Sequence, residues 1–480
     1  MDRKWRTLAI VCVAIFMLLL DITIVNVALP KIQRDLHSSF TDLQWVVDAY
    51  SLMLATVVLN AGSLGDLLGR KRVFLIGVVL FTAASAACGA ATSPLFLNLA
   101  RGAQGIGGAI MFAVSLALLS QEFHGRERGT AFGIWGATVG AAVAIGPLVG
   151  GALTEWAGWR WIFFVNLPIG AFCVFAGARV LHESRDEGHG GIDWAGFATL
   201  SGGLFALVLA LLRGNDWGWS SGREVGLFAA GGGLLLVFCV AEWRQENPMF
   251  DLRLFGVPAF AGAQIVAFTI SSSMFALFLY LTLYLQNVLG YSPMQAGLRF
   301  LPLSMISFFA APASGRLSER VPVRWLLGGG MGLVALSLYL MYGVHTSSGW
   351  TTLLAGFLVG GVGIGMVNPP LASTAVSVVP PQRAGMAAGV NNTFRQVGIA
   401  TGIAGLGAIF QGALSPKYAH AIAGGAVRGV QAKAEFVHGL NDILLVATFV
   451  ALAGAVAAIV LVRQSDFVAS GPPQPQQQQA

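Results

Sequence analysis

Runs of about 20 apolar residues recur along this chain from one end to the other, separated by short polar breaks. A run of that length crosses the hydrocarbon core of a bilayer as a helix, because a helix satisfies its backbone polar groups internally. The sequence therefore predicts an all-α integral membrane protein. We expect about fourteen transmembrane helices, at residues 8–29, 45–64, 73–91, 95–119, 130–153, 162–181, 194–212, 225–241, 259–288, 296–315, 325–343, 353–373, 386–410 and 443–462.

The composition supports this prediction. Only 10% of the 480 residues are charged and the mean hydropathy is +0.73, whereas a soluble protein carries about a quarter charged residues. Basic residues precede the first span, as they do in a signal peptide, but the apolar run is too long and lacks a small-residue cleavage pattern. We therefore expect the first span to be retained.

Basic residues in the loops predict the orientation. When the loops are assigned alternately to the two sides, the side of the N-terminus has roughly 17 Lys and Arg and the other side roughly 8. Both termini are therefore expected in the cytoplasm, with the chain in the cytoplasmic (inner) membrane. The net charge of +6 follows from this bias and gives no reason to expect nucleic acid as a partner. The four cysteines lie in predicted spans at unrelated spacings, so they indicate neither disulfides nor a metal site.

Two loops share a pattern that suggests an internal repeat. After the second span, Gly62 is followed four residues later by Asp66 and then by basic residues; after the tenth span, Gly315 is followed by Glu319 and Arg320. The repeat predicts two six-helix bundles offset by a two-helix insertion, an arrangement common in secondary transporters. The predicted domains are an N-terminal bundle at 1–181, linker segments with two inserted helices at 182–258, a C-terminal bundle at 259–462 and a disordered cytoplasmic tail at 463–480.

Five stretches together resemble one known family. They are LDITIVNVALP at residues 20–30, the loop at 62–72, RGAQGIG at 101–107, GPLVGG at 146–151, and YLQNVLGYSP with the following Ala-Gly pair at 284–297. In this order they resemble the fourteen-span drug:proton antiporters of the major facilitator superfamily, which include multidrug exporters. The resemblance covers the chain up to its tail. It implies the major facilitator fold, proton-driven export of small molecules and a transporter that is not an enzyme.

An aspartate inside the first span is the main functional candidate. Low dielectric disfavours a charged carboxylate, so burial can bring proton exchange by such a group towards neutral pH, and ionisable residues within spans are functional by default. We therefore expect Asp21 to couple transport to protons or to bind a cation; a structural hydrogen bond between helices is the alternative. Asp48, near the outer end of the second span, is a secondary candidate and equally a solvated acid.

The fourth span supplies a partner for this acid. Arg101 and Gln104 are three residues apart, so they share one helical face. A guanidinium stays protonated and must find a partner at this depth. We expect Arg101 to point towards Asp21 and to regulate its proton affinity, with a bond to a backbone carbonyl as the alternative. The resemblance likewise associates the matching arginine with proton transfer.

Two groups of residues are predicted to act in gating. Small residues let helices approach closely and proline bends a helix, while acids facing basic residues at a helix end can form a switchable charged contact. The resemblance marks the first of these groups as an antiporter signature. The predicted gating residues are Gly146, Pro147, Gly150 and Gly151 in the fifth span, Gly62, Asp66, Gly69, Arg70 and Lys71 in the first loop, and Glu319 and Arg320 in the second.

Polar and aromatic residues on other spans are candidates for the substrate cavity. For Arg395 the sequence leaves a cavity position and a cytoplasmic surface position equally open. The predicted cavity residues are Asn26, Gln104, Phe275, Tyr280, Tyr284, Asn391 and Arg395.

The function expected from these features is proton-driven export of hydrophobic small molecules, cationic drugs among them, by alternating access. We expect no cofactor beyond the proton gradient, because the sequence has no GxxxxGK[ST] loop for ATP. The expected partners are the substrate, protons and the lipid bilayer, with the chain as a monomer. Export of an endogenous metabolite, siderophore or lipid is the first alternative. A membrane sensor or enzyme is a remote one, because no catalytic cluster such as HExxH occurs.

Overall fold

The computed structural model describes residues 2–38, 40–123, 125–185, 193–244, 250–318, 320–380, 383–415 and 429–467. Every regular element in these ranges is a helix, as the sequence predicts. The residues from 468 onward, which make up most of the predicted disordered tail, lie outside the described ranges.

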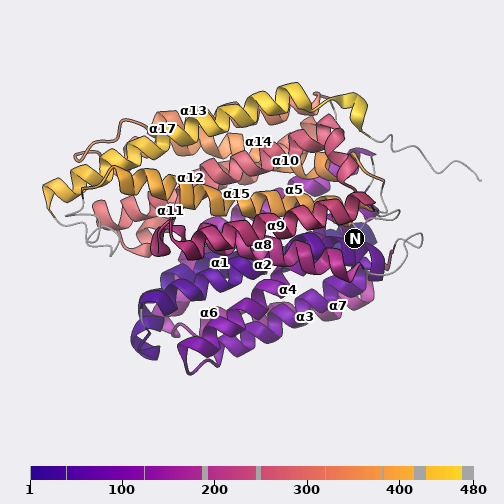
Figure 1. Ribbon diagram of the computed structural model, residues 1–480, viewed down its shortest axis with the longest axis horizontal. Coiled ribbons are helices and arrows are strands. Elements are labelled where there is room, and N and C mark those ends of the chain that lie inside the picture. Colours follow the sequence, from indigo (N-terminus) through magenta and orange to yellow (C-terminus); the bar gives the residue numbers. More distant parts are fainter. Residues whose placement is uncertain are drawn as a thin grey trace, which may run out of the picture.

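The first part of the chain forms one group of roughly parallel helices (Figure 1). Its N-terminus lies at one end of the bundle, which we call the N-terminal end. The helices are α1 (Arg3–Leu36), α2 (Phe40–Leu68), α3 (Arg70–Gly89), α4 (Pro94–Glu122), α5 (Gly125–Trp156), α6 (Trp161–Phe164) and α7 (Asn166–Val180).

The second part forms another group, and two helices lie between the groups in the view of Figure 1. The intervening helices are α8 (Trp194–Trp217) and α9 (Gly222–Arg244), followed by the short η1 (Leu252–Gly256). The second group comprises α10 (Pro258–Ile270), η2 (Ser271–Phe275), α11 (Ala276–Leu283), η3 (Tyr284–Val288), α12 (Pro293–Leu317), α13 (Val323–Met341), η4 (Trp350–Leu353), α14 (Leu354–Ser377), α15 (Ala384–Gly412), α17 (Val430–Leu461) and η6 (Gln464–Asp466).

Twelve segments in the described part of the chain are long and apolar enough to cross a membrane. The helices α5, with 32 residues, and α15, with 29 residues, are long enough but are not among these twelve. The polar residues of α15 face other helices, so its composition is less apolar than that of a lipid-facing span. The predicted multi-pass all-α architecture is confirmed, and the count of fourteen spans stays a prediction.

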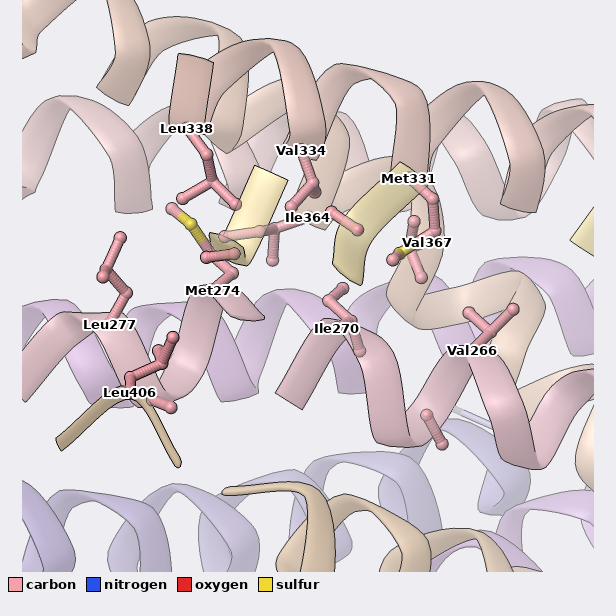
Figure 2. Close-up of a cluster of buried hydrophobic side chains, with 14 of the residues drawn as sticks. Val266, Ile270, Met274, Leu277, Met331, Val334, Leu338, Ile364, Val367 and Leu406 are labelled. Atoms are coloured by element: carbon pink, nitrogen blue, oxygen red, sulfur yellow. The ribbon is translucent and has the colours of Figure 1, made fainter. Parts of the chain in front are cut away.

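The second group packs around a continuous apolar core (Figure 2). One face of the α10–η2–α11 segment carries Val266, Ile270, Met274 and Leu277, at helical spacing. Side chains from α13 and α14 pack with them in the same core. The opposite face of this segment is thereby directed towards α15, to which α10 and η2 are also packed.

The helix α14 contains two consecutive prolines, Pro369 and Pro370, inside its span. Because Pro370 has no N–H, it cannot donate to the carbonyl of Met366 four residues earlier. The hydroxyl of Ser314 on α12 donates to that carbonyl at 2.8 Å. A side chain of a neighbouring helix thus satisfies the backbone group that the proline frees, as a membrane interior requires.

The two groups meet along two seams, α2 against α15 and α5 against α12. At the N-terminal end both seams close on glycines of the repeated loops. A Cβ on Gly62 would lie 3.3 Å from the Cα of Gly389, and a Cβ on Gly315 would lie 3.4 Å from the Cα of Gly133. The second and tenth predicted spans therefore occupy matching positions in the two groups, as their shared pattern indicated.

The inserted helix α8 covers the seam between α2 and α15. Leu52 and Ala55 of α2, Val208 of α8 and Ala400 of α15 form one buried apolar cluster. Nearer the N-terminal end, the amide of Asn60 on α2 donates to the hydroxyl of Ser201 on α8 at 2.6 Å. The insertion is thus docked on both groups at one of their two seams.

Candidate functional site

Asp21 lies at the centre of a buried polar cluster between α1, α4 and α7. Its side chain is fully buried. One carboxylate oxygen accepts from the guanidinium of Arg101 at 2.5 Å, and the other accepts from the amides of Gln104 and Asn166, each at 2.9 Å. Both oxygens therefore have charged or polar donors, which is what a buried carboxylate needs.

Arg101 is held by contacts on several sides. Its Nη1 also donates to the side-chain oxygen of Gln104 at 2.7 Å, and its Nε donates to the carbonyl of Val46 at 2.9 Å. The Tyr50 ring lies under the guanidinium, with 4.3 Å between Cζ and the ring centroid. Both expected bonds, to the acid and to a backbone carbonyl, are therefore present at once. These contacts fix the orientation of the guanidinium, with its Nη1 directed at the carboxylate.

The sequence did not single out Asn166 and Ser85, which complete the cluster. The amide of Asn166 bridges Asp21 and the hydroxyl of Ser85, and that hydroxyl donates to the carbonyl of Phe163 at 2.9 Å. Asn166 is buried in the sixth predicted span. A polar residue in an apolar run was the available signal, but only the packing of α7 on α1 relates it to Asp21.

Thr23, two residues after Asp21, is bonded within its own helix. Its hydroxyl donates to the carbonyl of Leu20 at 2.9 Å. Asp21 does make hydrogen bonds between helices, the expected alternative, but its partners are Gln104 of α4 and Asn166 of α7. Of Asn26, only the backbone is described, so its predicted place in the cavity lies outside the described side chains.

Asp48 is neither in the Asp21 cluster nor a free surface acid. It forms an ion pair with Arg213 of α8 at 3.1 Å. The Arg213 side chain is 3% exposed and Asp48 is 21% exposed, and the guanidinium also lies 4.6 Å from the centroid of the Trp45 ring. Asp48 thus fastens the inserted helix to α2. The available signal for this partner was an arginine directly after the apolar run at 194–212.

The glycines of the predicted α5 stripe face two different helices. Gly150 lies against α1, where a Cβ would be 2.9 Å from the Cα of Ile24, and Gly146 lies against Thr23. Gly151 instead faces Met294 at the start of α12, with 3.8 Å to its Cβ. The α5 helix therefore contacts α1 within a turn of Asp21 and contacts the other helix group with its other side. The side chain of Pro147 lies outside the described residues.

Asp66 joins the two helix groups at the N-terminal end. Its carboxylate pairs with Arg70 at 2.7 Å and accepts from the backbone N–H groups of Gly385 and Met386 at 3.2 and 2.9 Å. These N–H groups belong to the first turn of α15, where unpaired donors and the helix dipole favour an anion. The acid of the first loop therefore caps a helix of the opposite group, a contact that closes this end.

The turn around Gly69 places the basic residues of that loop. Gly69 has a φ of +108°, a conformation that only glycine adopts at little cost. Beyond it, the backbone N–H groups of Lys71 and Arg72 donate to the two oxygens of Glu183, each at 3.1 Å, and Lys71 Nζ donates to the carbonyl of Ala178. Lys71 therefore anchors α3 to the end of α7 and does not reach Asp66.

The second loop differs from the first. Gly315 lies against Gly129 of α5, but the side chain of Arg320 is exposed. Glu319, the predicted counterpart of Asp66, lies outside the described residues. The structure thus describes the acid-capped contact in the first loop only.

The predicted cavity residues of the second group separate into two sets. The hydroxyls of Tyr280 and Tyr284 donate to the carbonyls of Ile403 and Ser348. The remaining residues, Phe275, Asn391 and Arg395, lie on facing surfaces of η2 and α15. Arg395 is buried among helices, so the surface position is not the one observed, and its place in a substrate cavity stays a prediction.

Comparison with known proteins agrees with this architecture. Residues 11–403 match the Major Facilitator Superfamily. The chain also resembles the human organic anion transporter MFSD10 (TETRAN) in structure, with a TM-score of 0.67 over 95% of this chain and all of the other, at 15% sequence identity. That likeness concerns the fold.

Several curated relatives are resistance and export proteins. The Tetracenomycin C resistance and export protein of Streptomyces glaucescens is 37% identical over 409 residues, covering 85% of this chain and 76% of the relative. The Multidrug resistance protein Stp of Mycobacterium tuberculosis is 39% identical over 412 residues, with the same coverage. The Puromycin resistance protein pur8 of Streptomyces alboniger is 36% identical over 468 residues, covering 96% of this chain and 92% of the relative.

The family match covers most of the chain, and the relatives named above are exporters or resistance proteins. This chain, with its bundle of apolar helices and its buried charge cluster, is therefore a multi-pass membrane transporter, not an enzyme, and belongs to the Major Facilitator Superfamily.

Proposed function

We propose that this transporter is a proton-coupled antiporter that exports hydrophobic small molecules by alternating access. The observation that carries the proposal is the fully buried Asp21, bound by Arg101 and placed one turn from the contact between α1 and α5. An ionisable pair at this depth is expensive to maintain without a function. The names of the relatives, which include tetracenomycin C export and puromycin resistance, support drug-like molecules as cargo.

The ion pair gives a simple coupling scheme. A nearby guanidinium favours the charged form of a carboxylate, and a low-dielectric surrounding without it favours the neutral form. When α1 and α4 shift relative to each other within the first group and Arg101 separates from Asp21, the carboxylate takes up a proton; when the pair re-forms, it releases that proton. Gln104 and Asn166 hold the carboxylate in place for this exchange. In this scheme the transport cycle needs no cofactor beyond the proton gradient.

Asp66 supplies the gate in this proposal. The described conformation is closed at the N-terminal end, where Asp66 caps α15 and glycines of the two seams meet. Opening that end requires the loss of the two backbone hydrogen bonds, while Asp66 keeps its partner Arg70 on its own side. A charged contact that forms in one state and breaks in the other is suited to a two-state transporter.

We further propose that α5 and α15 complete a set of fourteen spans. Both are long enough to cross a bilayer, and both lie at the seams, where polar and small residues face protein. Fourteen spans divide the chain into two bundles at 1–181 and 259–462, a linker at 182–258 and a tail at 463–480. Both termini then lie on the cytoplasmic side of the inner membrane. The chain is proposed to act as a monomer.

The test is efflux under an imposed pH gradient in proteoliposomes, with puromycin and ethidium as cargo, for the parent and for Asp21→Asn. Neutralising the side chain is expected to abolish gradient-driven efflux while the variant still inserts and elutes as a single folded species. Asp442→Asn, which removes a half-exposed acid on α17, is the matched control and should retain efflux. Unchanged efflux by Asp21→Asn would remove this residue from the mechanism.

A further inference from the structure

Arg395 differs from the other buried arginines of the described residues. Arg70, Arg101 and Arg213 each pair with an aspartate, namely Asp66, Asp21 and Asp48. Arg395 has no acidic partner within the described part of the chain. Its one hydrogen bond goes from Nη1 to the neutral side-chain oxygen of Asn368 on α14, at 3.1 Å. A guanidinium stays charged in a protein, and a buried charge without a counter-charge is costly.

The position of Arg395 makes a ligand the natural source of that counter-charge. Arg395 is 9% exposed, the largest exposed fraction among the four buried arginines. It lies on α15 with its Cζ 5.6 Å from the centroid of the Phe275 ring. Asn368 accepts from one nitrogen of the fork, and no hydrogen bond joins the other nitrogens to the described residues.

Two further donors lie along the same surface of α15. Gln264 Oε1 accepts from Asn391 Nδ2 at 3.2 Å, which orients the Gln264 amide, and Gln264 Nε2 is buried with no hydrogen-bond partner. The hydroxyl of Ser271, one turn before Phe275, is likewise buried without a partner. Ser271 packs against α15, since a Cβ on Gly398 would lie 3.0 Å from the Ser271 Cβ. Unmet donors of this kind need an explanation in a native fold.

The backbone here is also irregular. Ser271–Phe275 forms a π-helical turn, a feature often found at functional sites. Gly398 and Gly402 let α15 approach this turn closely, because a Cβ on Gly402 would lie 2.6 Å from the Cα of Ser272. The surface that results combines one positive charge, two unpaired donors and an aromatic ring.

We propose that this surface binds an acidic group of the transported molecule, a carboxylate or phenolate attached to an aromatic or other apolar body. Arg395 supplies the charge-assisted bond to the acid, Gln264 and Ser271 are the additional donors, and Phe275 packs on the apolar part. This inference rests on the proposed function, in which a small molecule occupies the space between the helix groups. It favours acidic over cationic cargo at this site.

The test uses three fluorescent probes that share one ring system and chain length: pyrenebutyrate, pyrenebutanol and a pyrenebutyl trimethylammonium salt. Binding to the purified full chain in lipid nanodiscs is measured by fluorescence anisotropy, with empty nanodiscs as the background. The acid is expected to bind the parent protein about tenfold more tightly than the alcohol, in line with a hydrogen bond to a charged group. Equal or tighter binding of the alcohol or the cation would overturn the proposal.

Substitutions of Arg395 test whether this side chain causes the tighter binding of the acidic probe. Arg395→Gln should reduce the preference for the acid to within about twofold, and Arg395→Lys should keep part of it, because it keeps the charge but loses the fork. Arg244→Gln, which removes an exposed arginine at the end of α9, should leave the preference unchanged. A tenfold preference that survives in Arg395→Gln would contradict the assignment. The comparison of probes on the parent protein does not depend on how well any variant folds.

Measurements of probe binding and of probe transport distinguish a failure of the acid site from a failure of proton coupling. If the parent protein prefers the acid but an imposed pH gradient drives no probe across proteoliposomes, proton coupling fails and the acid site stands. If the gradient drives transport of the cationic and neutral probes as well as the acid, and binding shows no preference, proton coupling stands and the acid site fails.

Discussion

Asp21 has two kinds of partner, and they have different consequences. Arg101 supplies a charge, whereas Asn166 supplies a neutral hydrogen bond from α7. Within the Asp21 cluster, Asn166 also donates to the Ser85 hydroxyl at 3.0 Å. One amide thus connects three helices through polar contacts in an interior that otherwise contains apolar side chains.

Removing this amide should therefore destabilise the first group of helices. In Asn166→Leu, Asp21 and Ser85 each lose a donor, and we expect a loss of about 1–2 kcal/mol, the upper part of the range for hydrogen bonds in membrane proteins. The measurement is the thermal unfolding midpoint of the purified protein in detergent.

Gln411→Leu is the matched control for that variant, because it removes an exposed amide from the far end of α15. Its midpoint should stay near that of the parent. Equal midpoints for Asn166→Leu and the parent would show that the amide contributes nothing to the fold.

At the scale of a helix, the sequence predicted where helices occur much better than which residues of other helices they contact. The expected spans 73–91 and 325–343 correspond closely to α3 and α13, since hydropathy alone sets where a chain enters a bilayer. The expected single span 259–288 is present but contains two π-helical turns. Apolar content does not encode such a local change of hydrogen bonding.

Partners across the sequence could not be predicted in the same way. The pairing of Asp21 with Arg101 was expected because a guanidinium within a span needs a partner, and the contact is observed. The contacts of Asp48 with Arg213 and of Asp66 with the start of α15 were not foreseen. They join segments more than one hundred residues apart, and only the packing of helices against each other determines them.

Gly150 and Gly151 are neighbours on α5 but face different surroundings. In Gly150→Ala the new methyl group would lie 2.9 Å from backbone atoms of Ile24, so α5 and α1 must separate. Overpacking of this kind costs about 1–3 kcal/mol. We expect a lower thermal unfolding midpoint.

Gly151→Ala is the control for this substitution, because its Cβ would make an ordinary contact of 3.8 Å with Met294. Both variants change helix propensity alike, so a difference in midpoint isolates the steric effect. If the two midpoints fall by the same amount, the close approach of α5 to α1 is not the cause.

For the whole molecule, the contacts of Asp66 join the two helix groups at one end of the bundle, and we propose that they hold this end closed. Asp66→Asn keeps the shape of the side chain but weakens its bonds to the first turn of α15 and to Arg70. We expect this end to open more often, by about tenfold or more if each bond to a charged group is worth about 1.5–3 kcal/mol. The buried Ser63, one turn earlier on α2, is a site for a reporter.

The measurement is the rate of maleimide labelling of Ser63→Cys, in a background where the exposed Cys239 is replaced by serine. Labelling should be faster when Asp66→Asn is added and unchanged when Asp442→Asn is added. An unaltered rate with Asp66→Asn would show that this carboxylate does not hold the end closed.

The glycine contacts at the two seams have a consequence for the movement itself. Where Gly62 meets Gly385 and Gly315 meets Gly129, backbone touches backbone. At these points the two surfaces can separate without a change of side-chain rotamer, because glycine has no side chain. The bonds of Asp66 beside these glycines depend on its charge, so a single proton is able to weaken the hold between the groups at that end.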